Sequence, residues 1–550
     1  MIKNLRILAI IPARGGSKGI PRKNIRLMNG KPLISYAISC ALGSRYNPDV
    51  YVSTDDNEIA EICEQYGATI IRRDDRLSTD LVTLDPVVYD ATIKAEHENK
   101  VRYDYIITIQ PTSPLLHTET LDNAIEYAIN ENWDTVLSVV NHPHLSWGMD
   151  GNEVVPLYKE RKNRQELPPQ YFETGAFVIT KRDSLKEDSR IGNRVSVYEV
   201  SDDESIDIDN YNDWILAEHI LKKKRIIFRA DGYIELGLGH IYNCITMASK
   251  LIGHDTLILT KEDATVGIQK LDEVHAKYKT IRDENEIDSV IKEFKPDIWV
   301  NDCLNTSESY IKNLKRKVNR VVSIEDLGPG AKYADAVINA LYEDDNVANI
   351  YSGYQYVCLR DEFLTEKPKS FSKNVKNVVI MFGGTDPSNL NKMIYDILIS
   401  DDHDFGDIRF NFITGIGYDY KRHAVLSRPG KNIYVYPDVP RVTKFLKDAD
   451  IAIIGQGRSI FEVACMGVPT IVLSQNEREM SHGFAQMDHG FINLGMGEKI
   501  SPSVIINTLE WLIMTPAVRK NMHDLMTRVS LKYGGERVKN IILGEEEYEK

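Results

Sequence analysis

Short runs of consecutive apolar and β-branched residues recur along the chain and alternate with stretches of helical periodicity. The runs are Ile7–Ile11, Val50–Ser53, Ile106–Ile109, Val136–Val140, Ile226–Phe228, Ile298–Val300, Val378–Met381, Ile451–Ile454 and Thr470–Leu473. A strand without polar alternation is buried on both faces, as in parallel sheets covered by helices. Glycine-rich turns recur at the junctions between strands and helices. The sequence therefore predicts an α/β protein with doubly wound parallel sheets.

Length, charge and cysteine spacing narrow the class further. The 550 residues suit two to four domains at about 100–200 residues each. The net charge of −14 argues against a nucleic-acid or membrane-surface partner, and no apolar run approaches the ~18 residues of a membrane helix. The apolar run near the N-terminus stops at Pro12, which is typical of a strand and not of a signal peptide. Six cysteines without a CxxC pair fit neither a zinc site nor a disulfide framework, so we expect a reduced, cytoplasmic enzyme.

A domain boundary is expected where a helix over Trp214–Leu221 ends in four consecutive basic residues and a new buried strand begins at Ile226. This predicts one domain over residues 1–222 and a second over 225–550. A polar stretch, Thr365–Asn377, divides the second domain into halves of about 225–365 and 375–550. We found no short-period repeat and no low-complexity tract.

The first predicted strand leads into a glycine-rich loop, Ala13–Gly19, that also carries Arg14 and Lys18. Glycines allow a tight turn in which several backbone N–H groups point at one anion. The spacing is not that of a Walker loop, because the GK[ST] pattern is absent. Such a loop binds phosphate or is simply a basic surface loop, and the loop by itself leaves both interpretations open.

The stretch IPARGGSKGIPRKNI at residues 11–25 resembles the signature of the CMP-sialic acid synthetases, which activate nine-carbon α-keto sugar acids with CTP. Four further motifs follow in the family's order: VSTDD at 52–56, Arg73 with LSTD at 77–80, QPTSPL at 110–115 and SIDID at 205–209. The resemblance covers about residues 5–220. It implies a Rossmann-like nucleotidyltransferase domain and a homodimer formed through an arm at about residues 141–175.

The resemblance also assigns roles to individual residues. It implies catalytic roles for Arg14 and Lys23, triphosphate binding by Ser17 and Lys18, nucleotide contacts from Asn24, Arg73 and Gln110, and carboxylate binding by Arg164 and Gln165. Asp207 and Asp209 alternate along an extended segment, so both carboxylates face one side and suit Mg²⁺. The alternative for this segment is a solvated acidic turn, because Asp202, Asp203 and Glu204 lie just upstream.

The sequence departs from the family on the sugar side. Leu116 stands where sialic-acid members usually have arginine, Ser146 lies where they often have lysine, and Phe172 begins FETGA in place of RPNGA. These positions surround the sugar in the family. The resemblance therefore leaves the CTP chemistry intact and favours a pseudaminic, legionaminic or deaminated acid over N-acetylneuraminate.

The second domain begins with RADGYIELGLGH at 229–240, which resembles the UDP-sugar hydrolases of the pseudaminic acid pathway, relatives of spore-coat glycosyltransferases. Supporting motifs are VSIEDLG at 322–328, CLRDEF at 358–363, MFGGTDPSNL at 381–390 and GRSIFEVACMGVPTIVLS at 457–474. The resemblance covers about residues 225–500. It implies a two-Rossmann, GT-B type fold, a UDP-sugar substrate and His240 as the catalytic residue.

The nucleotide half of this domain is the part after residue 375. Gly383 and Gly384 follow a strand and can lie under a diphosphate, and Ser459 begins a helix whose N–H groups favour anions. The resemblance assigns Glu462 to the ribose hydroxyls, with an exposed helix carboxylate as the alternative, and we expect Asn476 and Glu477 to face the sugar. Several family hydrolases have Asp-His where this chain has Asp302-Cys303.

Three functions remain open for the second domain: a UDP-sugar hydrolase, a glycosyltransferase, and a non-catalytic nucleotide-binding module. The fusion to a synthetase favours the hydrolase, because both reactions then serve one nonulosonic acid pathway. The expected small-molecule partners are CTP, a nonulosonic acid and a UDP-sugar.

Overall fold

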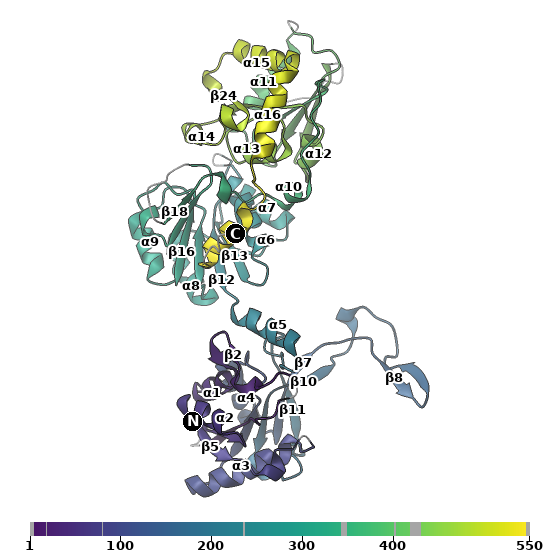
Figure 1. Ribbon diagram of the computed structural model, residues 1–550, viewed down its shortest axis with the longest axis vertical. Coiled ribbons are helices and arrows are strands. Elements are labelled where there is room, and N and C mark those ends of the chain that lie inside the picture. The colour runs from purple at the N-terminus through teal and green to yellow at the C-terminus, as the bar shows by residue number, and fades with distance from the viewer. Residues whose placement is uncertain are drawn as a thin grey trace. The chain divides into compact units, whose positions relative to one another are not determined.

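The computed structural model describes residues 5–17, 19–79, 81–234, 237–342, 349–400, 403–418 and 431–545. The chain divides into two compact units, Met1–Lys223 and Lys224–Lys550 (Figure 1). Both consist of strands flanked by helices, so the predicted α/β class is confirmed. No helix in the described ranges is long and apolar enough to cross a membrane.

The first unit has a seven-stranded sheet among its described residues, in the order β11-β7-β10-β6-β1-β4-β5. Its strands are β1 (Ile7–Pro12), β4 (Asp49–Thr54), β5 (Thr69–Arg72), β6 (Tyr105–Ile109), β7 (Thr135–Asn141), β10 (Tyr171–Lys181) and β11 (Val195–Glu199). The apolar runs predicted in this unit form β1, β4, β6 and β7. The sheet is mixed, because β10, which is not among the predicted runs, pairs antiparallel with both β6 and β7.

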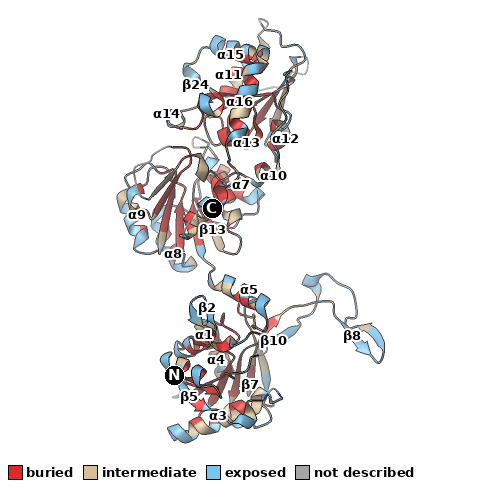
Figure 2. Cartoon of the chain, in the orientation of Figure 1, coloured by how far each residue is buried: buried red, intermediate tan, exposed pale blue. Residues whose placement is uncertain are grey.

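Helices cover both faces of this sheet and bury its continuous apolar strands. They are α1 (Leu33–Leu42), α2 (Asn57–Gln65), α3 (Leu84–Asn99), α4 (Thr118–Asn130) and α5 (Tyr211–Leu221). The six residues of β1 are all buried, and Figure 2 shows buried strands in the middle of this unit. Between β7 and β10 the chain forms an arm that carries the hairpin β8 (Trp147–Asp150) and β9 (Glu153–Pro156) and projects from the unit (Figure 1).

The first half of the second unit is a parallel sheet, seven-stranded in its described residues, in the order β14-β13-β12-β15-β16-β17-β18. Its strands are β12 (Arg225–Arg229), β13 (Asp255–Lys261), β14 (Tyr278–Ile281), β15 (Ile298–Asn301), β16 (Arg320–Ile324), β17 (Ala336–Asn339) and β18 (Ile350–Ser352). Its helices are α6 (Gly239–Lys250), α7 (Thr265–Glu273), α8 (Ile287–Phe294) and α9 (Glu308–Lys315). Two separate apolar clusters fill the two faces of this sheet.

The second half has a parallel sheet with six strands among its described residues, in the order β21-β20-β19-β22-β23-β24. Its strands are β19 (Asn377–Met381), β20 (Arg409–Thr414), β21 (Ile433–Pro437), β22 (Ile451–Ile454), β23 (Thr470–Ser474) and β24 (Phe491–Met496). Its helices are α11 (Leu390–Ile399), α12 (Thr443–Leu446), α13 (Ser459–Met466), α14 (Glu477–Met480), α15 (Pro502–Met514) and α16 (Pro516–Arg528). Each half thus has its own parallel sheet, as a two-Rossmann fold requires.

The two halves are joined by α10 (Asp361–Thr365) and again by the last helix, α17 (Gly534–Leu543). The prediction assigned residues 375–550 to the second half, but α17 returns to the first half and packs on α6. Its buried residues Val538, Ile541 and Ile542 belong to the same apolar cluster as β12 and α6. The chain therefore crosses between the halves twice.

Candidate functional sites

The predicted glycine-rich loop of the first unit lies at the carboxyl edge of the sheet, against the SIDID segment. It begins after Pro12, and the N–H of Ala13 donates to the carbonyl of Ser53 at the end of β4. A Cβ atom on Gly19 would collide with the backbone oxygen of Asp209. Glycine is needed at this position because the two backbones approach so closely. Two motifs at opposite ends of the domain sequence are therefore neighbours in space.

Two arginines lie close together at this edge. Arg73 is only 8% exposed, and its Nη2 donates to the carbonyl of Ser53 at 2.6 Å. Burial lowers the pKa of Arg73 to about 10; the negative charge of Asp55 opposes that shift, and the positive charge of Arg14 adds to it. Asn24 supports Arg14 by donating from Nδ2 to its carbonyl at 3.0 Å. Two cations that repel each other are stabilised by an anion bound between them, so this edge suits phosphate groups.

Lys23 connects the loop with the acidic segment. Its Nζ donates to the backbone oxygen of Ile208 and lies 3.8 Å from Oδ1 of Asp209. Ser17 is partly buried in the same loop. The predicted triphosphate ligand Lys18 lies outside the described residues. Lys23 thus places a cation next to the two aspartates.

Asp207 is the more buried member of the predicted metal pair. Its Oδ1 atom is buried and has no hydrogen-bond partner within the described ranges. Burial raises the pKa of Asp207; the nearby charge of Asp209 adds to the rise and Lys23 opposes it. Buried carboxylate oxygens normally have partners, so an unpaired one beside a second carboxylate fits a hard cation such as Mg²⁺. The described residues contain no group of three or more metal-binding side chains, so phosphate and water oxygens would complete the coordination.

Gly175 brings the predicted nucleotide contact Gln110 next to the acidic pair. Its φ of +73° is in the left-handed region, and a Cβ atom there would lie 2.8 Å from Nε2 of Gln110 and 3.5 Å from Oδ2 of Asp207. Glycine is required both by its backbone conformation and by this approach. Gln110 and Asp207 are therefore adjacent, as a site that binds both nucleotide and metal requires.

The predicted sugar-side residues are dispersed. Arg164 and Gln165 lie in a short 3₁₀ helix (Arg164–Glu166) on the exposed arm, and within the described ranges no bond joins them to the glycine-rich loop. Phe172 is 47% exposed at the base of the arm. Leu116 is 6% exposed and belongs to an apolar core cluster of the unit. Apolar packing against α4 explains why leucine occupies this position.

The second unit contains a cavity of about 280 Å³ lined by residues of both halves. Five predicted ligand-binding residues line it: Gly383, Gly384, Ser459, Glu462 and Asn476. Ser459 is the first residue of α13, and the two glycines follow β19. A cavity outside the carboxyl ends of parallel strands is the usual binding place in such folds.

Glu477, a predicted sugar contact, is not among the described residues that line the cavity. Its side chain is 76% exposed and lies 3.1 Å from Nζ of Lys499, away from the cavity. Glu479, two residues later, lines the cavity and accepts the backbone N–H of Gln475 at 2.8 Å. Asn476 caps α14, because its side-chain oxygen accepts the backbone N–H of Glu479 at 2.9 Å. The helical turn that follows the cap directs Glu477 outward and Glu479 inward.

His240 is the second residue of α6, between Gly239 and Asn243, which both line the cavity. Its Nδ1 atom lies 2.6 Å from Oδ1 of Asp302, and the other carboxylate oxygen accepts Nδ2 of Asn243 at 2.6 Å. Asp302 is 1% exposed, so its carboxylate is shielded from water, whereas the side chain of His240 is 16% exposed. A carboxylate at Nδ1 fixes the imidazole orientation and leaves Nε2 for chemistry. Cys303 takes no part, because its Sγ lies 3.3 Å from the carbonyl of Arg229.

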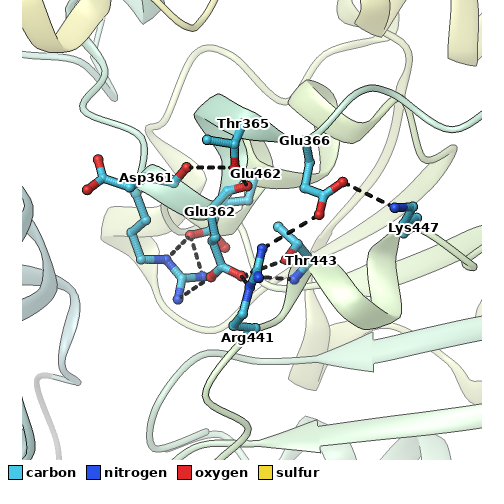
Figure 3. Close-up of polar contacts among 9 residues, drawn as sticks. Asp361, Glu362, Thr365, Glu366, Arg441, Thr443, Lys447 and Glu462 are labelled. Atoms are coloured by element: carbon cyan, nitrogen blue, oxygen red, sulfur yellow. Dashed lines mark hydrogen bonds and ion pairs between the residues drawn. The ribbon is translucent and has the colours of Figure 1, made fainter.

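Glu462 does not stand free in the cavity. Arg360 contacts its Oε1 atom from both Nε, at 3.0 Å, and Nη2, at 2.8 Å. Arg360 also pairs with Glu362 at 2.9 Å, and Glu362 accepts the hydroxyl of Thr443 at 2.8 Å. Figure 3 shows Glu462 and Glu362 side by side, with Arg441 and Thr443 on the other side of Glu362. This network holds the Glu462 carboxylate in place at the cavity wall, and burial raises its pKa.

Comparisons with known proteins match the first unit. The cytidylyltransferase family model matches residues 8–185. The post-translational flagellin modification protein B of Campylobacter coli is 30% identical over 227 residues, which are 40% of this chain and 97% of that protein. The chain belongs to the cytidylyltransferase family. N-acylneuraminate cytidylyltransferase A of Danio rerio is 35% identical over 224 residues, 39% of this chain and 51% of that protein, so the chain spans about half the length of that curated relative.

For the second unit, the crystal structure of MurG from Acinetobacter baumannii is similar at 14% identity, with a TM-score of 0.43 over 58% of this chain and 99% of that chain. The cytidylyltransferase match includes the glycine-rich loop, Arg73, Gln110 and Gly175, whereas Asp207 and Asp209 follow the matched residues.

Sequence reasoning missed Asp302, Glu325 and Arg458 in the second unit. Asp302 drew notice only as the residue before Cys303. Glu325 and Arg458 lie within longer motifs and had no role assigned to them. Their partners are 62 and 133 residues away in the chain, so no local pattern could have revealed the pairs. The one available signal was an acidic residue directly after a buried strand, which holds for Asp302 after β15 and for Glu325 after β16.

Proposed function

We propose that the first unit transfers CMP from CTP to a nine-carbon α-keto sugar acid of the pseudaminic or legionaminic type and releases pyrophosphate. The observation that carries this proposal is that the glycine-rich loop packs against the backbone of Asp209, two residues after the buried, unpaired carboxylate of Asp207. Membership of the cytidylyltransferase family supports it. The class of the sugar rests on the departures at Ser146 and Phe172.

In the proposed reaction, the anomeric hydroxyl oxygen of the sugar bonds to the α-phosphorus of CTP as the bond to the β-phosphate oxygen breaks. Arg14, Arg73 and the loop N–H groups bind the triphosphate, and Lys23 stabilises charge on the reacting phosphate. Asp207 and Asp209 would hold Mg²⁺, which when bound neutralises phosphate charge. Asn24 and Gln110 orient the loop and the nucleotide.

Arg164 and Gln165 would bind the sugar carboxylate from the arm. Because they lie on a projecting segment, we propose that the arm of one copy completes the site of a second copy in a homodimer. The apolar side chains exposed on the arm, which include Trp147, Met149 and Leu157, support an interface there.

We propose that the second unit hydrolyses a UDP-linked 2,4-diacetamido-2,4,6-trideoxy hexose to UDP and free sugar. The His240–Asp302 pair beside the cavity carries this proposal. The Nε2 atom of His240 accepts a proton from water as the water oxygen bonds to the anomeric carbon and UDP leaves with the bonding electrons. A glycosyltransferase would use the same cavity with a sugar acceptor in place of water, and a silent binding module would bind UDP without turnover.

Two assays test these proposals on the full chain. Pyrophosphate release is measured with each of the four ribonucleoside triphosphates, Mg²⁺ and a panel of nonulosonic acids; only CTP with a nine-carbon acid should react. UDP release from the sugar nucleotide is measured without any acceptor. Turnover only after acceptor addition would support the transferase, and UDP binding without turnover would support the silent module.

A further inference from the structure

Glu325 is a buried carboxylate in the second unit that none of the proposed steps uses. It follows β16 directly, and its side chain is 3% exposed. Its φ of +52° lies in the left-handed region, which is unfavourable for a residue with a side chain. Strain of this kind persists where the surroundings hold a residue in place, often at functional sites.

Arg458 binds this carboxylate from the other half of the unit. Its Nη2 lies 3.1 Å from Oε1 of Glu325. Arg458 directly precedes α13 and lines the cavity together with Ser459 and Gly383. Its guanidinium therefore belongs to the part of the cavity where the glycine loop and the start of α13 meet, which is where phosphate groups would bind.

The remaining charged neighbours of Glu325 come from several elements. Arg478 on α14 donates to its backbone oxygen at 2.5 Å, and Asp302 and His240 lie near enough to affect its ionisation. Burial raises the pKa of Glu325 to about 7; Asp302 adds to the rise, whereas Arg458 and His240 oppose it. The charge of Glu325 in turn contributes to the raised pKa of Tyr342, behind burial as the main cause. Oε2 is buried and has no partner in the described part of the chain.

We propose that Glu325 is a positioning residue: it holds the Arg458 guanidinium at the phosphate end of the cavity. The proposal rests on the proposed nucleotide-sugar function of the second unit. It adds the residue that holds Arg458, the cation we expect to bind the phosphates. Glu325 acts through Arg458 and does not touch the ligand, because its own carboxylate is inaccessible. Without it, Arg458 loses its only ion-pair partner found among the described residues and becomes free to leave the cavity.

Binding of UDP and of uridine separates this role from a merely structural one. Affinities are measured by calorimetry for the wild-type full chain and for the variants Glu325→Ala, Glu325→Gln and Arg458→Gln. The double variant that combines Glu325→Ala with Arg458→Gln is measured in the same way. Glu325→Ala should weaken UDP about tenfold or more and leave uridine unchanged, because only phosphate binding is lost. Glu325→Gln keeps an oxygen acceptor for Arg458 and should stay near the wild-type affinity for UDP. In the Arg458→Gln background, Glu325→Ala should cause no further loss.

Asp450→Asn is the matched control, because Asp450 is also buried and paired, with Lys369, but does not line the cavity. It should leave both affinities unchanged. If Glu325→Ala does not fold, Glu325→Asp replaces it, since a shorter carboxylate also releases Arg458. Three results would overturn the role of Glu325 and leave the proposed function of the second unit standing. They are equal losses of affinity for UDP and uridine, no loss of affinity for UDP, and additive losses in the double variant. A wild-type protein that binds no UDP would overturn the proposed function of the second unit, and the assignment with it.

Discussion

Nδ1 of His240 lies 2.6 Å from Oδ1 of Asp302, a carboxylate that is almost completely buried. The two residues come from different elements, the start of α6 and the segment after β15. A buried carboxylate that accepts from Nδ1 selects the tautomer whose Nε2 can accept a proton. The geometry therefore gives His240 the form that a general base needs.

Replacing either partner should stop UDP release without preventing UDP binding. His240→Ala should lower the turnover number about 10²–10⁴-fold, the usual effect of losing a general base. Asp302→Asn should also lower it, because an amide can donate to Nδ1 and favour the wrong tautomer. Turnover is measured from released UDP, and binding by calorimetry. Asp272→Asn, a surface change on α7, is the control; full activity of His240→Ala would contradict the hydrolase mechanism.

Asp207→Asn should abolish CMP transfer and stabilise the first unit in the absence of metal. The folded-state pKa of Asp207 is raised, so its ionisation destabilises the fold as pH rises above 3.8, the unperturbed value. An amide removes that cost at neutral pH. Calorimetric unfolding of the full chain measures this stabilisation. The transition of the first unit is identified as the one that CTP shifts.

Asp203→Asn, in the acidic run upstream, provides the matched control for this change. Asp203 pairs with Lys223 at 3.2 Å and is not part of the carboxylate pair. It should leave CMP transfer and the second unit's UDP release unchanged. A wild-type rate of CMP transfer in both Asp207→Asn and Asp209→Asn would refute the metal site.

Glu204 should be structural, although it lies within the same acidic segment. Burial alone would raise its pKa, but bonds from His117, Thr120 and Ser201 outweigh burial and lower the pKa to about 2. Its stabilising effect is therefore present above the unfolded value of 4.5 and is lost as pH falls toward 2. Glu204→Gln should cost about 1–3 kcal/mol at pH 7, and less as the pH approaches 3. Urea unfolding at both pH values measures this; an equal cost at both would contradict the ionic explanation.

N-acetylneuraminate should be a poor substrate beside a 5,7-diamino or deaminated relative. Phe172 and Ser146 replace polar or cationic residues of sialic-acid members, and missing hydrogen-bond partners discriminate strongly. Phe172→Arg should raise kcat/KM for N-acetylneuraminate relative to the diamino acid. Val154→Arg, another exposed position on the arm, should not. The highest kcat/KM of the wild-type enzyme on N-acetylneuraminate would show this specificity to be wrong.

The sequence predicted those parts of the fold that local patterns determine. Strands β1 and β22 were found because their residues are apolar and buried on both faces, and α13 because it follows a glycine turn. Neither β10 nor its antiparallel direction was predicted, because this strand begins with the exposed residues Tyr171–Glu173 and is not one continuous apolar run. The return of α17 to the first half depends on packing between distant segments, which has no local signal.

The sites divide in the same way. The residues of the glycine-rich loop are consecutive in the sequence, and Asp207 and Asp209 lie in one short motif. Each of these two groups was therefore predicted as a unit. The partners Asp302 and Arg458 are set by which strand ends and helices meet at the cavity, and these pairings appear only in the fold. The sequence did not single out Glu479, because the turn of α14 decides which of the nearby carboxylates lines the cavity.

We propose above all that the first unit activates a nine-carbon sugar acid with CTP. The most direct measurement is mass analysis of products after the full chain is incubated with CTP, Mg²⁺ and a pseudaminic or legionaminic acid. We predict that the wild-type protein forms a CMP-sugar and an equal amount of pyrophosphate, and that Asp207→Asn forms neither product. Unconsumed CTP with every nine-carbon acid tested would contradict it.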